Sequence, residues 1–250
     1  VLSINQNLTI DATGHQVTIT GNYTVQVFTI PAGVVATLTH LHIINAAYST
    51  SSAIYNAGTL TLNNATIANG QTIGVGIYNA ASLTINNSLI TNNAGGGITS
   101  QPSRGTAVLA INNTTITGNG PSGPGIYASV GQVTISNSTI TGNTDGAING
   151  GNGTLIVSNS TIANNTAPGN GLGGISGGPT YLRSSIVAGN SGVTDIAGFV
   201  VSGGHNLIQK TGFTYTNTDQ VGVNPLLNAL ADNGGPTQTM SLQRGSPAVG

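Results

Sequence analysis

Few side chains in this sequence could carry acid–base chemistry, and they are scattered along it. The acidic residues are five aspartates and no glutamate: Asp11, Asp145, Asp195, Asp219 and Asp232. Hydrolysis of a glycosidic bond needs two carboxylates held close together. No two of these aspartates are near each other in sequence, so we expect no catalytic residue.

Asp145 is the strongest remaining candidate for catalysis. It ends the run Asn143-Thr144-Asp145, which copies a fragment of the polygalacturonase signature. The paired aspartates, the Gly-His-Gly and the Arg-Ile-Lys of that signature do not follow. We therefore interpret Asp145 as a turn residue, and a polysaccharide lyase or hydrolase stays the alternative function.

His40 and His42 lie two residues apart in a stretch that alternates apolar and polar residues. In a strand they would share one face and could bind a metal, but two histidines without a third ligand make a weak site. We interpret them as exposed strand histidines and expect neither a metal nor a cofactor.

Two sets of side chains are expected to face outward and to offer a binding face. Tyr55, Tyr78 and Tyr127 each follow an isoleucine that should point inward, so they could form a stripe for sugars or simply pack across neighbouring turns. The second set consists of threonines that flank an inward isoleucine: Thr115, Thr117, Thr139 and Thr141. A flat rank of Thr-x-Thr is the surface that ice-binding proteins use, although threonine is also simply a good strand residue.

A ten-residue repeat organises the middle of the chain, and the candidate residues lie in it or beside it. Its copies occupy residues 60–69, 83–92, 109–118, 133–142 and 155–164, with a degraded copy at 180–189. Successive copies begin 22 to 26 residues apart. A repeat spacing of twenty-odd residues is typical of a solenoid, in which each repeat packs only on its neighbours.

An asparagine stands in the middle of each full copy, between two strand-like segments. These residues are Asn64, Asn87, Asn113, Asn137 and Asn159, and Ser184 takes the sixth slot. Asparagine tolerates the left-handed backbone that a sharp bend needs. We expect this column to form the bends and its stacked amides to bond in a ladder.

Each period contains three short apolar segments, whose recurring Ile or Leu must point inward because side chains alternate along a strand. Burial of one such side chain contributes about 1.5–3 kcal/mol. Three strands in each turn of 22 to 26 residues predict an all-β fold, a single right-handed parallel β-helix, with an irregular C-terminal cap. We divide the chain into N-terminal coils (1–50), regular repeats (51–199) and a C-terminal coil and cap segment (200–250).

The composition narrows the classes of partner. Charged residues are 4% of the chain and the net charge is −1, against about 25% charged residues in a typical soluble domain. No basic field exists to bind nucleic acid, and no apolar run is long enough for a transmembrane helix. There is no cysteine, which is compatible with a secreted bacterial protein. Because residue 1 is not Met, we expect the chain to be a piece of a longer one.

The repeats Asn137-Ser138-Thr139-Ile140 and Asn159-Ser160-Thr161-Ile162 resemble those of bacterial β-helical surface proteins of the polymorphic outer-membrane-protein-like kind. The tail, with His205-Asn206-Leu207-Ile208, Asn224-Pro225-Leu226-Leu227 and Gly245-Ser246-Pro247-Ala248, is similar to that of choice-of-anchor Q proteins. This resemblance implies a secreted bacterial protein attached to the cell surface and carries no catalytic residue over.

The sequence therefore predicts a non-catalytic extracellular protein that is structural, fibre-forming or adhesin-like. Its expected partners are further copies of itself, in a head-to-tail oligomer or filament, or surface glycans. Besides the polysaccharide lyase or hydrolase, a glycan- or ice-binding module is the third hypothesis.

Overall fold

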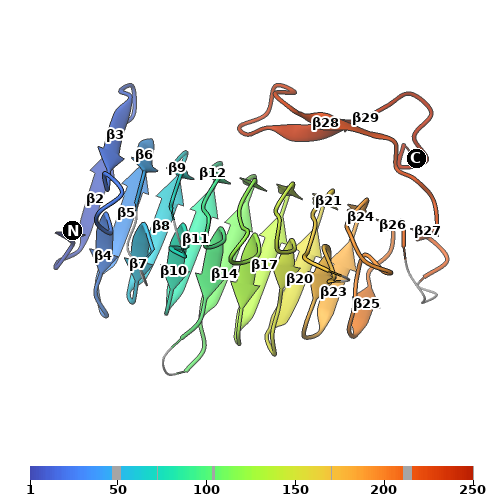
Figure 1. The fold of residues 1–250 in the computed structure, drawn as a ribbon, viewed down its shortest axis with the longest axis horizontal. Helices are drawn as coiled ribbons and strands as arrows, with labels where there is room; N and C mark the ends of the chain where they lie inside the picture. The colour runs from blue at the N-terminus through green and yellow to red at the C-terminus, as the bar shows by residue number, and fades with distance from the viewer. Residues whose placement is uncertain (47–51, 72, 103–104, 170, 211–215, 250) are drawn as a thin grey trace.

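The computed structural model describes residues 1–46, 52–71, 73–102, 105–169, 171–210 and 216–249. The described residues form strands and turns but no helix. Successive strands are placed in three sheets in rotation, and each strand pairs in parallel with the strand one turn away (Figure 1). The chain is thus a parallel β-helix, which confirms the predicted fold.

Three long sheets, here called A, B and C, make up the solenoid. Sheet A contains β1 (Leu2–Ser3), β4 (Phe28–Ile30), β7 (Ile54–Asn56), β10 (Ile77–Asn79), β13 (Ile98–Ser100), β16 (Ile126–Ala128), β19 (Ile148–Asn149) and β22 (Ile175–Ser176). Sheet B contains β2 (Leu8–Asp11), β5 (Val35–Thr39), β8 (Thr59–Asn63), β11 (Ser82–Asn86), β14 (Val108–Asn112), β17 (Gln132–Ser136), β20 (Thr154–Ser158), β23 (Thr180–Arg183) and β25 (Val200–Ser202). Sheet C contains β3 (Val17–Thr20), β6 (Leu41–Ile44), β9 (Thr66–Ala68), β12 (Leu89–Thr91), β15 (Thr115–Thr117), β18 (Thr139–Thr141), β21 (Thr161–Ala163), β24 (Ile186–Ala188), β26 (Leu207–Ile208) and β27 (Gln220–Val221).

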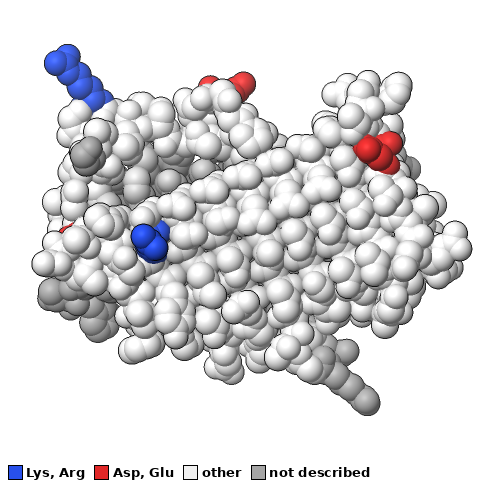
Figure 2. All heavy atoms as spheres, turned by 180° about the vertical axis from the view of Figure 1, so that it is seen from behind, with Lys and Arg blue, Asp and Glu red and all other residues white. Residues whose placement is uncertain are grey.

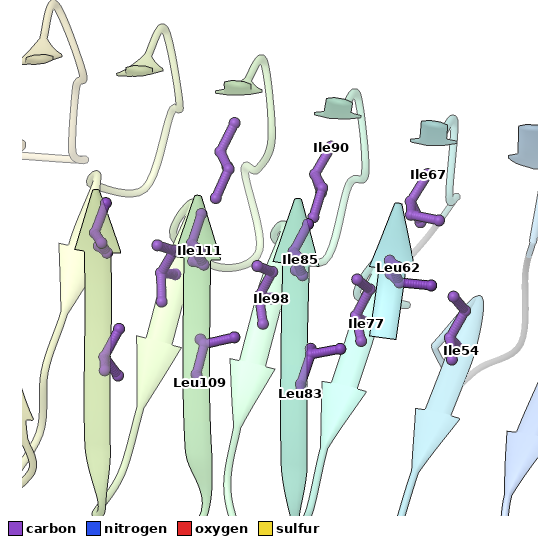
Figure 3. Packing of buried hydrophobic residues seen from close by; sticks show 14 of the residues in the cluster. Ile54, Leu62, Ile67, Ile77, Leu83, Ile85, Ile90, Ile98, Leu109 and Ile111 are labelled. Atoms are coloured by element: carbon purple, nitrogen blue, oxygen red, sulfur yellow. The ribbon is translucent and has the colours of Figure 1, made fainter. Parts of the chain in front are cut away.

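The core is a set of stacks of identical or similar apolar side chains. Ile54 pairs in register with Ile77, which pairs with Ile98, and all three are buried. Figure 3 shows these side chains repeating from turn to turn inside the solenoid, beside the Leu and Ile of sheets B and C. Alternation along each strand directs every second residue inward, so the repeated apolar positions of the sequence become one continuous core.

The bend between sheets B and C uses one left-handed residue in each turn of the solenoid. Asn64, Asn87, Asn113, Asn137 and Asn159 all have φ between 49° and 50°. His40 (φ 56°) and Ser184 (φ 48°) occupy the same slot in turns before and after them. The predicted role of the asparagines in the bend is confirmed, and we call these seven residues the turn column.

The predicted amide ladder exists, but other asparagines form it. The side chains of the five turn-column asparagines make no hydrogen bond to any described residue; Asn64, Asn137 and Asn159 are exposed at the corner, and Asn87 and Asn113 are half-buried. The buried ladder instead consists of asparagines that follow the sheet C strands: Asn93, Asn119, Asn143, Asn165 and Asn190. The assignment of ladder residues from the sequence is corrected accordingly.

Every rung of this ladder points the same way along the solenoid. The Asn119 backbone N–H and Nδ2 both donate to Asn143 Oδ1, at 3.0 Å each. Asn143 repeats this to Asn165 Oδ1 at 3.1 and 2.9 Å. The Nδ2 atoms also reach backbone carbonyls, for example that of Ile116 at 3.1 Å from Asn143. Buried amide groups are thereby satisfied.

A second ladder runs beside the turn column and is made of hydroxyls. Its members accept a backbone N–H from the turn before and donate to a carbonyl two residues back: Ser88, Thr114, Ser138, Ser160 and Ser185. Both ladders therefore send their donors towards the C-terminal end, where an acceptor must terminate each.

Aspartates supply those acceptors. Asp195 is fully buried, and its Oδ1 accepts the Asn190 backbone N–H at 3.1 Å and Nδ2 at 3.0 Å. The hydroxyl ladder passes through Asn206 to Asp219, whose Oδ1 accepts the Asn206 backbone N–H and Nδ2 at 2.9 Å. An ionised carboxylate only accepts hydrogen bonds, so it completes a ladder of donors.

The C-terminal segment does more than continue the solenoid to β27. Residues 227–242 form an antiparallel hairpin of β28 (Leu227–Ala231) and β29 (Thr239–Leu242). Figure 1 shows this hairpin running back beside the solenoid, over sheet C. Thr115 Oγ1 donates to the Gln238 carbonyl at 2.6 Å and Thr237 Oγ1 to the Asn113 carbonyl at 3.2 Å. Nothing in the repeat pattern indicated this position.

Candidate functional site

The hairpin changes what the outward threonines can do. Thr115, Thr139 and Thr141 lie on the outer face of sheet C, yet they are only 0%, 4% and 5% exposed. The hairpin lies over this part of the sheet and bonds to Thr115 directly. Thr117 is half-buried. The four threonines face outward as expected, but three of them are closed to a large ligand, which corrects the expectation of an open face.

The tyrosines lie on the outer face of sheet A, as expected. Tyr55 and Tyr78 are in register, and their rings stack with centroids 5.6 Å apart and an interplanar angle of 19°. Burial, followed by the neighbouring Tyr55 and Tyr127, raises the pKa of Tyr78. Thr99 lies between Tyr78 and Tyr127 in the sheet. The stacking covers one face of the Tyr55 ring and one face of the Tyr78 ring.

Asp145 lines a hollow of about 380 Å³ beside sheet A, together with Pro124, Asn149, Pro168 and Leu172. Among the described residues of that lining it is the single carboxylate. Asp195 is buried as the end of the amide ladder. The pair of carboxylates that glycoside hydrolysis requires is not assembled there.

The two histidines do not share a strand face. His40 is a turn-column residue, and His42 lies in β6. Nδ1 of His40 is 2.9 Å from Thr13 Oγ1 and 3.9 Å from Asp11 Oδ1. A hydrogen bond from the Thr13 hydroxyl is the main cause that lowers the pKa of Asp11. The described residues contain no group of three or more His or Asp side chains that could hold a metal ion.

The candidate site is a groove between the hairpin tip and the turn column. Its volume is about 510 Å³. One wall carries the turn-column residues His40, Asn64 and Asn87, and the floor contains Thr66 and Leu89. The opposite wall comes from the hairpin tip: Asp232, Gly235, Pro236, Thr237 and Gln238. The groove therefore joins segments separated by well over a hundred residues.

Charge is sparse here and elsewhere on the surface. The lining of the groove includes one carboxylate, that of Asp232, and no Lys or Arg among the described residues. Figure 2 shows a broad face of the molecule with few, widely separated charged side chains. Such a surface has no strong field for steering a charged partner.

The protein is a β-solenoid with a C-terminal hairpin bonded to its side. The family described as right handed beta helix region matches residues 3–130 and 53–227. The chain therefore belongs to that family, and its β-helix is right-handed. Comparison with curated proteins and with solved structures found no match. The part of the chain that the structure describes contains no helix with the length and hydropathy of a membrane span. A fold alone does not define an activity, so the function must be argued from the groove.

The sequence analysis did not predict the groove, and only the turn-column wall of the groove has a recognisable sequence pattern. The turn-column asparagines were identified, but as ladder members rather than as unpaired groups. The hairpin tip had no periodic partner that could reveal its contact with Asn113 and Thr115. The true ladder did leave a signal, because an Asn recurs directly after the left-handed Asn or Gly that follows five successive sheet C strands, β12 to β24, as in Gly142-Asn143.

Proposed function

We propose that this protein is a non-catalytic extracellular surface protein of bacterial type, which works as an adhesin-like scaffold for glycans. One observation carries the proposal: the polar side chains divide into two sets. The ladder residues, including Asp195 and Asp219, are committed to the fold. The side chains of the turn-column asparagines make no hydrogen bond within the described chain, and two of them, Asn64 and Asn87, line a groove.

The same division argues against the rival class, a polysaccharide lyase or hydrolase. Two of the five aspartates end the ladders, and Asp145 and Asp232 line different hollows. Catalysis at a glycosidic bond would need two of these carboxylates in one site. The scaffold proposal needs only a rigid surface with hydrogen-bonding groups at fixed spacing.

The test is to incubate the purified protein with insoluble and soluble polysaccharides and to measure retention and product formation separately. Retention without new reducing ends or unsaturated products is the expected result. Release of such products, abolished by Asp145→Asn, would overturn the proposal in favour of the enzyme. Stacking of protomers end to end stays a prediction, which light scattering of the same sample checks.

Binding to ice is a second candidate, favoured by an observation on sheet B rather than sheet C. Its outer face carries a column of residues in register, one from each successive turn: Thr9, Thr37, Thr61, Thr84, Ala110 and Thr134. Parallel pairing spaces them by about 4.8 Å. A thermal-hysteresis assay tests this candidate; freezing and melting points that coincide would remove it.

A further inference from the structure

We propose that the groove between the hairpin tip and the turn column binds a neutral oligosaccharide, with the side-chain amides of Asn64 and Asn87 as its main hydrogen-bonding groups. This inference rests on the proposed scaffold function and names its ligand class and site. It begins from two side-chain amides that line the groove and make no hydrogen bond to any described residue.

The first step concerns what these amides can offer. Each asparagine side chain carries two donors and one acceptor oxygen. Asn64 and Asn87 occupy neighbouring turns of the solenoid, since β8 and β11 pair in register just before them. Paired parallel strands lie about 4.8 Å apart, close to the length of one pyranose unit. His40 stands in the same column one turn earlier, so three successive turns present polar side chains to the groove.

The second step concerns the rest of the lining. Leu89 and Pro236 add apolar surface to the polar Thr66, Asp232 and Gln238. A sugar ring has hydroxyls at its edge and C–H groups on its faces, so it fits a lining that mixes both kinds of group. The volume of about 510 Å³ lies within the range of roughly 300–1,000 Å³ that small-molecule sites occupy.

The third step concerns charge. A uronic-acid oligomer would place carboxylates beside Asp232, and no Lys or Arg of the described lining would balance them. Like charges at close range oppose binding. A neutral oligosaccharide avoids this repulsion and can donate hydroxyl hydrogens to the Asp232 carboxylate. The lining therefore selects against the substrates of pectin- or alginate-degrading enzymes.

The fourth step concerns rigidity. Hydrogen bonds of 2.6 and 3.2 Å fix the hairpin tip to Thr115 and Asn113. Directly behind the turn column, the hydroxyl ladder bonds each turn to the next, as in Ala65 N–H to Ser88 Oγ at 3.0 Å. Both walls are thus held before a ligand arrives, which reduces the entropy lost on binding.

The test uses two matched double variants. Asn64→Gly with Asn87→Gly removes both amides from the groove, and glycine accepts their left-handed backbone. Asn137→Gly with Asn159→Gly makes the same change at two exposed turn-column residues that do not line the groove. Binding of cello-, xylo- and manno-oligosaccharides and of oligogalacturonate is measured by calorimetry on each protein.

We expect at least one neutral oligosaccharide to bind the unchanged protein, and the groove variant to bind it about tenfold or more weakly, as the loss of two hydrogen bonds implies. The control variant should stay within about twofold of the unchanged protein. Equal losses in both variants, binding of oligogalacturonate alone, or no binding of any neutral probe would overturn the inference. Glycan retention that survives the groove variant would leave the scaffold function standing and refute only this site.

Discussion

Replacement of Asn143 by alanine removes one rung from the middle of the amide ladder. Asn143 is fully buried, and its Oδ1 accepts the backbone N–H and Nδ2 of Asn119 at 3.0 Å each. Its own Nδ2 donates to Asn165 Oδ1 at 2.9 Å and to the Ile116 carbonyl at 3.1 Å. Alanine can replace none of these bonds.

The magnitude follows from which groups lose their partners. The Asn119 backbone N–H loses its one acceptor among the described residues, and a buried unsatisfied donor costs about 1–3 kcal/mol. Asn119 Nδ2 keeps the Ile90 carbonyl at 3.0 Å, so its loss is smaller. The Ile116 carbonyl also loses the hydrogen bond from Asn143 Nδ2. Together these losses should lower the free energy of unfolding by about 2–4 kcal/mol.

Asn137→Gly is the matched control, because Asn137 belongs to the turn column and its side chain has no hydrogen bond within the described chain. Glycine suits its φ of 49°, and surface substitutions usually change stability by less than about 0.5 kcal/mol. Urea unfolding at neutral pH, followed by circular dichroism, measures both variants. Equal destabilisation by the two substitutions would refute the division between ladder and turn asparagines.

Three further predictions concern the ladder end, the hairpin and the core. Burial alone would raise the pKa of Asp219, but hydrogen bonds from Ser202, Asn206 and Thr216 outweigh it and lower the pKa below the ordinary 3.8. The ionised Asp219 carboxylate therefore stabilises the fold above about pH 3.8, and this stabilisation is lost as the pH falls through the lowered pKa of the folded state. Asp219→Asn should lower the free energy of unfolding at pH 7, and by progressively less as the pH falls below about 3.8, as a series of urea midpoints would show. Thr115→Val removes the bond to the hairpin, should destabilise its docking by about 0.5–1.5 kcal/mol, and should speed proteolytic cleavage within residues 232–238; unchanged cleavage would mean that this bond does not hold the tip. Ile116→Ala should lower the free energy of unfolding by about 2–5 kcal/mol, because Ile116 is fully buried; a loss below about 1 kcal/mol would contradict its place in the core.

The solenoid could be predicted from the sequence because its determinants are local and repeated. The isoleucines at 54, 77 and 98 recur at one position in successive turns, and the structure pairs them in register. The left-handed bend at Asn64 and its equivalents depends on a single residue. The repeat spacing was therefore enough to predict both the buried core residues and the bends between sheets B and C.

The ladder assignment failed because several asparagine columns share one period, among them Asn63, Asn86 and Asn112, whose side chains also bond from turn to turn. Asparagines at the positions of Asn87 and Asn93 recur together in four successive turns, and the sequence alone does not say which of the two points inward. The structure shows that the residue in the left-handed conformation itself points out, while Asn93, one place after the left-handed Asn92, is buried. Which of the two asparagines is buried depends on the backbone geometry of the corner, because both positions carry the same residue type.

The groove could not be predicted because half of it comes from outside the repeat. The hairpin tip contacts Asn113 and Thr115 across more than 120 residues of sequence. Neither Thr237 nor Gln238 belongs to any periodic pattern. A contact of this kind depends on packing of a unique segment on a repeated surface, which a period cannot reveal.

Hydrogen exchange of the asparagine side-chain amides, resolved by NMR, tests the central claim most directly. We predict slow exchange for the buried ladder amides, such as those of Asn119, Asn143 and Asn165, and fast exchange for those of Asn64 and Asn87. Protected amides at Asn64 and Asn87, with fast exchange at Asn143, would contradict the account, because the turn column would then be the ladder and the groove would have no free amides.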